Sequence, residues 1–187
     1  AREHEVDIPE TPMIFMKPPS AVINPGQAIV LPPQSQQVEH EGELAVVIGR
    51  RGRWIRLEDT ANHILGYTVA NDVTARDLQN RDGQWTRAKG FDTFCPVGPW
   101  IETEADPSDL LVTTRVNGEI RQMSSTREMV FGIPQLIVYI SSVMTLEPGD
   151  LILTGTPAGV SPLHPDEVVE VEIEGIGKLS NLVKAHQ

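Results

Sequence analysis

Prolines and glycines interrupt this chain at short intervals, and this feature limits its fold more than any other. The 187 residues include 15 Pro and 15 Gly. Proline lacks the backbone N–H group that the interior of a helix or of a central strand requires, so the prolines of residues 1–37 permit only loop and edge-strand structure there. Further along, short runs rich in Val, Ile and Leu lie between turn signals, as strands do. The pattern predicts a mostly β protein with a few helices, of the α+β class.

Length and charge limit the classes of partner. A chain of 187 residues is long enough for one domain with a sizeable core, so we expect a single domain over residues 1–187. The net charge of −11 disfavours binding to nucleic acid or to anionic membranes. No apolar run approaches the ~20 residues that a membrane-spanning helix needs. The expected partner is therefore a small molecule or another protein.

Cys95 is the single cysteine. It cannot form a disulfide within the chain, so a cytoplasmic location is predicted. A buried apolar role is favoured for it over a role as a nucleophile. The chain opens on Ala1 without an initiator Met and without a capping or strand signal, and we expect native sequence to precede it.

The apolar spacing predicts elements along the rest of the chain. Residues 38–48 form a strand whose alternation places Glu41, Glu43, Ala45 and Val47 on one face. Asn117-Gly118 suits a type I′ hairpin turn. In chain order, the other expected elements are a short helix at 57–65, a strand at 67–70 that leads to Asp72, a polar loop at 78–95, hairpin strands at 111–116 and 119–123, a helix at 134–144, and strands at 151–153 and 168–173.

Two carboxylates on one face of an apolar strand are the most unusual feature of the sequence. The Cβ atoms of Glu41 and Glu43 would lie only ~6–7 Å apart, and their charges repel unless a cation or basic groups lie between them. A hard divalent ion with oxygen ligands removes that repulsion, and Asp72 at the end of another strand would complete the set. The pattern also suits a solvent-facing strand, which on spacing alone is the commoner case.

Other polar residues leave alternatives open. Lys89 and Arg76 can be surface charges or anion-binding groups. The turn from Gly155 to Gly159 follows an apolar strand, so it can present backbone N–H groups and the Thr156 hydroxyl to a carboxylate, or be a plain tight turn. The five His are scattered without metal-ligand spacing, and the sequence carries no nucleotide-binding or nucleophile-elbow motif.

Several ordered segments together resemble the fumarylacetoacetate hydrolase family, in its branch of acylpyruvate hydrolases, oxaloacetate decarboxylases and 2-hydroxyhepta-2,4-diene-1,7-dioate isomerases. The resemblance covers most of the chain. It favours a metal site over a solvent-facing strand as the interpretation of Glu41 and Glu43. The segments that carry it are Phe15 to Pro18, His40 to Gly49, Gly66 to Gln79, Trp85 to Lys89, Val116 to Glu119, Leu146 to Asp150 and Leu153 to Val160.

The resemblance implies a mixed β-roll and a homodimer. It further implies a single catalytic domain, with Mg²⁺ or Mn²⁺, or Ca²⁺ as a possible substitute, held by Glu41, Glu43 and Asp72. The family positions that line the substrate site match Lys89, Arg76, Gln79 and Thr156, with the Gly155 backbone beside them. In this scheme the metal stabilises an enolate, Lys89 adds positive charge near its oxygen, and Gly155 and Thr156 hold a carboxylate.

One departure concerns the catalytic lid. The family carries a His-x-x-Glu pair near its N-terminus; Glu3 matches the Glu, whereas the matching His would precede Ala1 and His4 is out of register. Three functions follow as alternatives: an isomerase or decarboxylase acting on 2-hydroxy-dienedioates in aromatic catabolism, a C–C hydrolase of acylpyruvates or an oxaloacetate decarboxylase, and a non-catalytic protein that binds a dicarboxylate or a partner.

Overall fold

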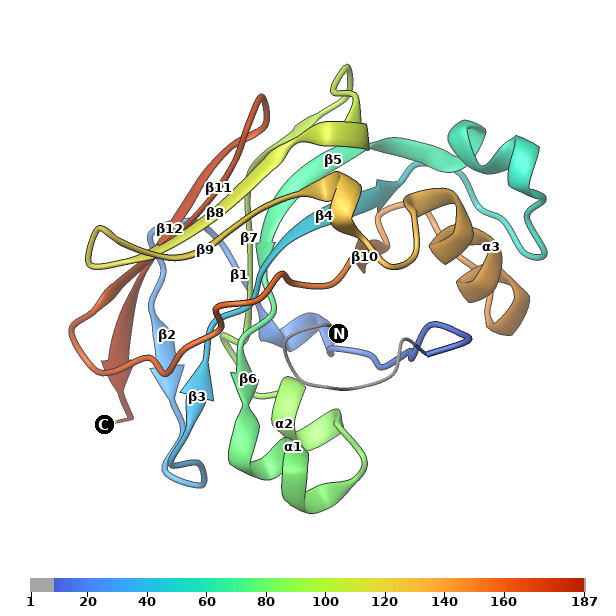
Figure 1. Cartoon of the computed structure of the whole chain (residues 1–187). Helices are drawn as coiled ribbons and strands as arrows, with labels where there is room; N and C mark the ends of the chain where they lie inside the picture. The colour runs from blue at the N-terminus through green and yellow to red at the C-terminus, as the bar shows by residue number, and fades with distance from the viewer. Residues whose placement is uncertain (1–8, 187) are drawn as a thin grey trace.

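The computed structural model describes residues 9–186, and in this part of the chain two five-stranded sheets curl around a common core (Figure 1). The first sheet has the order β1 (Val22–Ile23), β7 (Cys95–Glu102), β5 (Ile64–Asn71), β4 (Gly42–Ile48) and β10 (Leu151–Leu153). The second has the order β2 (Ile29–Leu31), β12 (Gly177–Ala185), β11 (Val168–Ile173), β8 (Leu111–Val116) and β9 (Glu119–Ser125). A short pair joins β3 (Val38–Glu39) to β6 (Thr74–Ala75). Both parallel and antiparallel pairs occur, so the predicted mostly β, mixed fold is confirmed.

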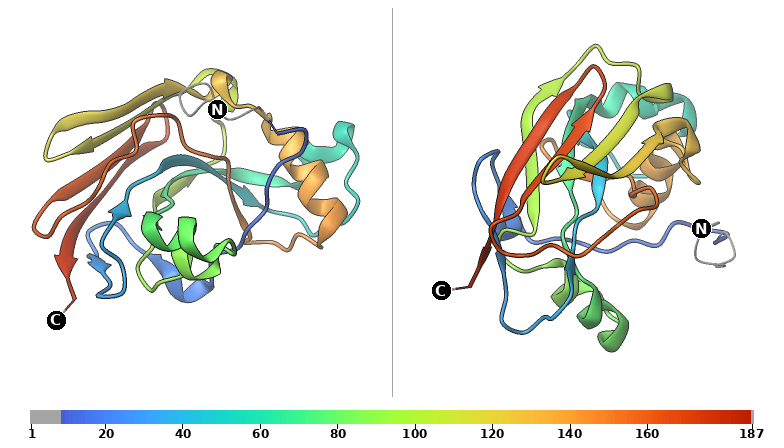
Figure 2. Two further views of the ribbon diagram at one scale, coloured as in Figure 1. Left: turned by 60° about the horizontal axis from the view of Figure 1, so that its bottom comes forward. Right: turned by 60° about the vertical axis from the view of Figure 1, so that its left-hand side comes forward.

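Residues 9–186 also form three α-helices and four 3-10 helices. The α-helices are α1 (Arg76–Asp82), α2 (Thr86–Lys89) and α3 (Ile133–Val143), and the 3-10 helices are η2 (Pro19–Ala21), η3 (Leu57–His63), η4 (Pro107–Asp109) and η5 (Thr126–Glu128). The predicted helix at 134–144 corresponds to α3, which has Pro134 in its first turn and packs beside η3 (Figure 2). Of the helices described, none has the length and apolar character needed to cross a bilayer.

The main core lies between the two sheets. From the first sheet, Leu44, Val46 and Ile48 of β4 point into it, and from the second sheet Val171 and Ile173 of β11 meet them. The opposite face of β4 is also covered, so that all seven of its residues are buried. Glu43 therefore lies on a strand that has no solvent-facing side, and the solvent-facing interpretation is wrong.

Several predicted boundaries were wrong. The strand predicted at 67–70 is part of the longer β5, and the hairpin strand predicted at 119–123 continues to Ser125 in β9. The strand predicted at 38–48 is interrupted at His40 and Glu41, because β3 pairs with β6 whereas β4 pairs with β5. The helix predicted at 57–65 is the 3-10 helix η3, which ends at His63, and β5 begins at Ile64. The polar loop predicted at 78–95 contains most of α1 and all of α2, which are too short to show a helical period and are held by the buried side chains of Leu78 and Ala88.

The predicted hairpin is confirmed, since Asn117 and Gly118 both have positive φ angles of 51° and 82° between β8 and β9. The strands predicted at 151–153 and 168–173 are confirmed as β10 and β11. No element was predicted over β12, the longest strand described. The buried amide of Asn181 interrupts its apolar alternation between Leu179 and Val183.

Candidate metal centre

The three carboxylates meet where two pairs of consecutive strands are interrupted. The break between β3 and β4 lies opposite the break between β5 and β6. Gly42 pairs with Asn71 in the antiparallel register. One residue beyond that pair, the backbone N–H of Asp72 donates to the carbonyl of Glu41 over 2.8 Å, and the N–H of Glu41 donates to the Asn71 side chain. The register therefore places Asp72 beside Glu41, although 31 positions separate them in the sequence.

Glu41, Glu43 and Asp72 form one compact cluster. A carboxylate oxygen from each can be chosen so that all three lie within 4.8 Å of one another. The residues are 7%, 3% and 1% exposed, respectively. Three carboxylates at this separation and this burial repel strongly, and the arrangement requires positive charge.

Three cationic side chains surround the cluster. The Lys89 ammonium donates to Glu41 over 2.8 Å and to Asp72 over 2.6 Å, and it is almost fully buried. Lys17 donates to the other oxygen of Asp72 over 2.6 Å. Arg76 donates to Glu41 and to Glu39. Burial by itself lowers the pKa of Lys89, but the charges of Asp72 and Glu41 outweigh it and the pKa is raised, so Lys89 is a cation at neutral pH.

Glu43 is the member without a cationic partner of its own among residues 9–186. Its carboxylate accepts a hydrogen bond of 2.6 Å from the backbone N–H of Gly155. Burial, and then the charges of Asp72 and Glu41, raise the pKa of Glu43 well above its usual value. The ionised form of this carboxyl is therefore unfavourable until another positive charge arrives.

A divalent cation fits this donor set. Hard cations such as Mg²⁺ prefer carboxylate oxygens. Lys17, Arg76 and Lys89 pair with the other carboxylates but leave the negative charge of Glu43 without a partner, and a bound cation would pair with it. The metal would be held by Glu41, Glu43 and Asp72, as the sequence predicted. Donor chemistry of this kind does not distinguish Mg²⁺ from Mn²⁺ or Ca²⁺, so the identity of the ion stays a prediction.

The predicted substrate residues lie around the cluster. Arg76 also donates to the Gln79 side chain over 2.5 Å, so both residues are next to Glu41. The Gly155 backbone touches Glu43, and the Thr156 hydroxyl donates to the carbonyl of Gly42 over 2.9 Å. Both hydrogen bonds of the Thr156 hydroxyl are to protein groups, the Gln122 side chain and the Gly42 carbonyl. Glu3, the predicted catalytic lid residue, lies outside the described residues.

Lys17, Glu39 and Gln122 were not predicted as site residues. Lys17 lies in one of the segments that carry the family resemblance. Its contact with Asp72 joins residues 55 positions apart, and no local sequence pattern predicts such a contact. His40 precedes Glu41 in the sequence, but its ring nitrogens lie near the side chains of Gln122 and Ser161, at 3.1 and 2.9 Å. Burial lowers the pKa of His40 to about 4, so it is neutral at physiological pH.

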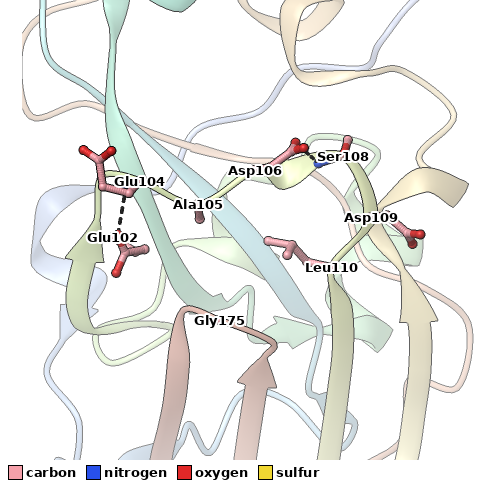
Figure 3. A pocket seen from close by; sticks show the side chains of 8 residues that line it. All are labelled: Glu102, Glu104, Ala105, Asp106, Ser108, Asp109, Leu110 and Gly175. Carbon is pink, nitrogen blue, oxygen red and sulfur yellow. Dashed lines mark hydrogen bonds between the residues drawn. The ribbon is translucent and has the colours of Figure 1, made fainter.

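A separate cavity of about 520 Å³ lies at the end of β7, away from the cluster (Figure 3). It is open and lined by eight residues, of which Glu102, Glu104, Asp106 and Asp109 are acidic. None of the lining residues belongs to the carboxylate cluster or to the cations around it. We assign no function to this cavity.

Comparison with known proteins identifies the fold. The sequence profile described as Fumarylacetoacetate (FAA) hydrolase C-terminal matches residues 1–184. The chain belongs to this family. The resemblance drawn from the sequence motifs is thereby confirmed. Members of the family are enzymes that act on small molecules and typically use a divalent metal.

Relatives of known structure and curated relatives agree with this assignment. The crystal structure of a 5-carboxymethyl-2-hydroxymuconate delta-isomerase from Mycobacterium smegmatis is 52% identical, with a TM-score of 0.94 over 96% of this chain and 71% of that one. That of a 2-hydroxyhepta-2,4-diene-1,7-dioate isomerase from Mycobacterium marinum is also 52% identical, with a TM-score of 0.93 over 95% of this chain and 70% of that one. The mitochondrial oxaloacetate tautomerase FAHD2A of Bos taurus is 48% identical over 97% of this chain and 62% of its own length. The chain thus spans less than two thirds of that hydrolase-family relative.

Removing the Lys89 charge should destabilise the metal-free protein. Lys89→Met leaves Glu41 and Asp72 without their shared cation, and breaking a buried pair in this way costs about 3–5 kcal/mol. Urea unfolding in EDTA and in saturating Mg²⁺ measures the loss, and Mg²⁺ should recover part of it. Lys178→Met is the control, because the pair of Lys178 with Glu170 is exposed and is worth at most about 1 kcal/mol. Equal losses in the two variants would contradict the expected role of Lys89.

The Cys95 thiol should be unreactive in the native protein. It is 3% exposed, and burial raises its pKa to about 11, so the thiol stays protonated near neutral pH. A thiol reagent such as Ellman's reagent should react with it at about pH 8 only after denaturation with guanidinium. Rapid labelling of the folded protein would show an accessible thiolate and would contradict the buried apolar role.

Proposed function

We propose that this chain is a divalent-metal-dependent enzyme that moves a proton on a small 2-oxo acid or its 2-hydroxy-enoic form through a stabilised enolate. The reaction we favour is that of an isomerase or decarboxylase of the 2-hydroxyhepta-2,4-diene-1,7-dioate type, in aromatic catabolism. The observation that carries the proposal is the buried cluster of Glu41, Glu43 and Asp72 with the Lys89 ammonium against it.

The charges of the site favour an anionic substrate once a metal is bound. With Glu43 ionised, the carboxylates of the cluster and of Glu39 outnumber the three cations Lys17, Arg76 and Lys89 by one. A divalent ion reverses that sign, so the loaded site attracts a carboxylate. When bound, such an ion supplies Lewis-acid polarisation of the keto and carboxylate oxygens of a 2-oxo acid.

The protein's own residues would supply the remaining parts of the reaction. The Lys89 ammonium is held by two carboxylates at the cluster, where its charge stabilises negative charge that develops on a nearby oxygen. The Phe15 ring lies 4.8 Å from the Lys89 nitrogen and packs against Trp85, so it shields the ammonium from water. Arg76 and Gln79 lie on α1 beside the cluster, where they can contact a second carboxylate of a dicarboxylic substrate.

The similar proteins include isomerases that are 52% identical and a fumarylacetoacetate hydrolase from Exiguobacterium antarcticum that is 45% identical, and the higher identity favours isomerisation. The two mycobacterial proteins are named as isomerases, and the bovine protein is named as a tautomerase, which also rearranges a molecule without adding water. These names describe those proteins, and we extend the reaction class to this chain as part of the proposal. Glu3 would act on the proton or on water from the lid.

A substrate panel tests the proposal. The purified protein would be assayed with Mg²⁺ and with EDTA on a 2-hydroxy-dienedioate, oxaloacetate, acetylpyruvate and fumarylpyruvate, following ultraviolet absorbance and product identity. We expect Mg²⁺-dependent isomerisation or decarboxylation of the dienedioate, or tautomerisation of oxaloacetate. Exclusive cleavage of the acylpyruvates would replace this function by C–C hydrolysis, and binding of oxalate without any turnover would show a non-catalytic protein.

The homodimer remains a proposal from the family resemblance, and the cytoplasmic location remains a proposal from the single cysteine, Cys95. Exposed apolar side chains, among them Met13, Met16 and Trp100, offer surface that a second copy can cover. Light scattering of the purified protein would test the dimer, and a monomeric mass at micromolar concentration would contradict it.

A further inference from the structure

Gln122 is a buried polar side chain that the proposed reaction does not yet use. It lies on β9 in the second sheet, is 1% exposed, and reaches the start of β4 in the first sheet. Its Oε1 accepts a hydrogen bond of 3.0 Å from the backbone N–H of Gly42 and a second from His40 Nδ1. Its Nε2 donates to the Thr156 hydroxyl over 2.8 Å and to the Pro157 carbonyl over 2.7 Å. A primary amide has two donors and two acceptor sites, so Gln122 uses all of them.

These four bonds join the two segments that border the carboxylate cluster. Gly42 lies between the proposed ligands Glu41 and Glu43, and its backbone accepts from the Thr156 hydroxyl as well as donating to Gln122. The residue before Thr156 is Gly155, which donates to the Glu43 carboxylate. The Gln122 amide therefore adds a bridge between the ligand-bearing strand and the turn at 155–157, beside the direct bonds of Gly155 and Thr156 to that strand.

The Thr156 hydroxyl is engaged by the same contacts. It accepts from Gln122 and gives its single hydrogen to the Gly42 carbonyl. Gly155 donates its N–H to Glu43 and Pro157 has none, so the capacity of the turn at 155–157 to bind an anion rests with the Thr156 N–H. The contacts of Thr156 and Pro157 with Gln122 fix the direction of that N–H.

We propose that Gln122 is a positioning residue for the substrate: it holds the turn at 155–157 against β4, so that a carboxylate bound by the turn stands beside the metal. The proposal rests on the proposed function of the cluster. It assigns Gln122 no contact with the substrate. It predicts that a change at Gln122 weakens substrate binding, whereas a change at a buried amide away from the site lowers stability and leaves binding unchanged.

Two substitutions remove the amide in different ways. Gln122→Met keeps the length of the side chain but removes every hydrogen bond. Gln122→Glu keeps the acceptor toward Gly42 and His40, but it places a carboxylate against the oxygens of Thr156 and Pro157, from which it is repelled. Asn181→Leu and Asn181→Asp are matched controls, because Asn181 is 2% exposed and donates to the carbonyls of Asn24 and Gln27 between β1 and β2.

The test measures oxalate affinity in saturating Mg²⁺ by calorimetry, together with kcat, KM and the melting temperature. Oxalate serves as the probe because it mimics a 2-oxo acid enolate. Both Gln122 variants should bind oxalate at least tenfold more weakly and show a KM raised at least tenfold. The Asn181 variants should lose comparable melting temperature while their oxalate affinity stays within threefold of wild type.

The outcomes separate this inference from the proposed function. If wild type binds oxalate and turns over a substrate while a folded Gln122 variant stays within threefold of it in affinity and KM, the positioning role is overturned and the proposed function stands. If wild type binds no oxalate with Mg²⁺ and turns over nothing, the proposed function fails, and the inference with it. Should neither Gln122 variant fold, Thr156→Val provides the test. It removes the hydrogen bond between Gln122 and the Thr156 hydroxyl, and an unchanged oxalate affinity in this variant would overturn the positioning role.

Discussion

Glu43→Gln is expected to abolish Mg²⁺-dependent turnover without destabilising the metal-free protein. Gln keeps the shape of the side chain and an acceptor for the Gly155 N–H, but it cannot supply the anionic ligand. We expect kcat/KM to fall by about 10³-fold or more, which corresponds to about 4 kcal/mol of lost transition-state stabilisation. Because burial and the neighbouring carboxylates raise the pKa of Glu43, removing its charge should leave the metal-free protein as stable as wild type or more stable.

Asp72→Asn gives the informative contrast. It should lose turnover to a similar extent, but it leaves the buried ammonium groups of Lys17 and Lys89 without their shared carboxylate, so the metal-free protein should also lose stability. Glu170→Gln, at an exposed pair on β11, is the control and should retain activity.

Thermal melts with EDTA and with Mg²⁺ test the ligand role of both residues independently of activity. At a Mg²⁺ concentration one hundred times its Kd, wild type should gain about 2.7 kcal/mol of stability, and both variants should gain far less. Full activity, or a Mg²⁺-induced stabilisation equal to that of wild type, in either variant would remove that residue from the proposed metal centre.

Gly42→Ala is expected to destabilise the fold by about 3 kcal/mol, because a methyl group at this position has no room. An added Cβ would lie 2.1 Å from the Thr114 hydroxyl oxygen and 3.0 Å from Val171 Cγ1, both in the facing sheet. The strand would have to move away from that sheet, and Glu41 and Glu43 would move with it. Metal affinity should therefore fall together with the melting temperature.

Urea unfolding and Mg²⁺ titration measure these two effects. Gly132→Ala is the matched control, since its nearest neighbours would be 3.8 and 3.9 Å away, and it should cost under about 1 kcal/mol. The buried Thr114 hydroxyl has no hydrogen-bond partner among the described residues. Adding Thr114→Ala to Gly42→Ala should therefore recover part of the loss, and a double variant no more stable than Gly42→Ala would show that the clash with Thr114 is not its cause.

The sequence by itself determined the local features of this protein. Alternation along 41–48 placed Glu41 and Glu43 on one face, and that inference depends only on the two-residue period of a strand. The Asn117-Gly118 turn and the apolar spacing of α3 were likewise readable, because their signals lie within a few neighbouring residues. The order of several motifs was specific enough to predict the family, which the profile match then confirmed.

Only the tertiary structure decided how these pieces form a site. Spacing alone favoured a solvent-facing strand for Glu41 and Glu43, but the face of the strand that carries them is covered by segments distant in sequence, which bring Lys89, Arg76 and Gly155 against the two carboxylates. The antiparallel register brings Asp72 to Glu41, and Gln122 meets Gly42 across 80 positions. Contacts of this length leave no period or motif in the sequence, because they depend on which strands pair and how the sheets pack. The sequence therefore identified three carboxylates, whereas folding made them a buried cluster that needs a cation.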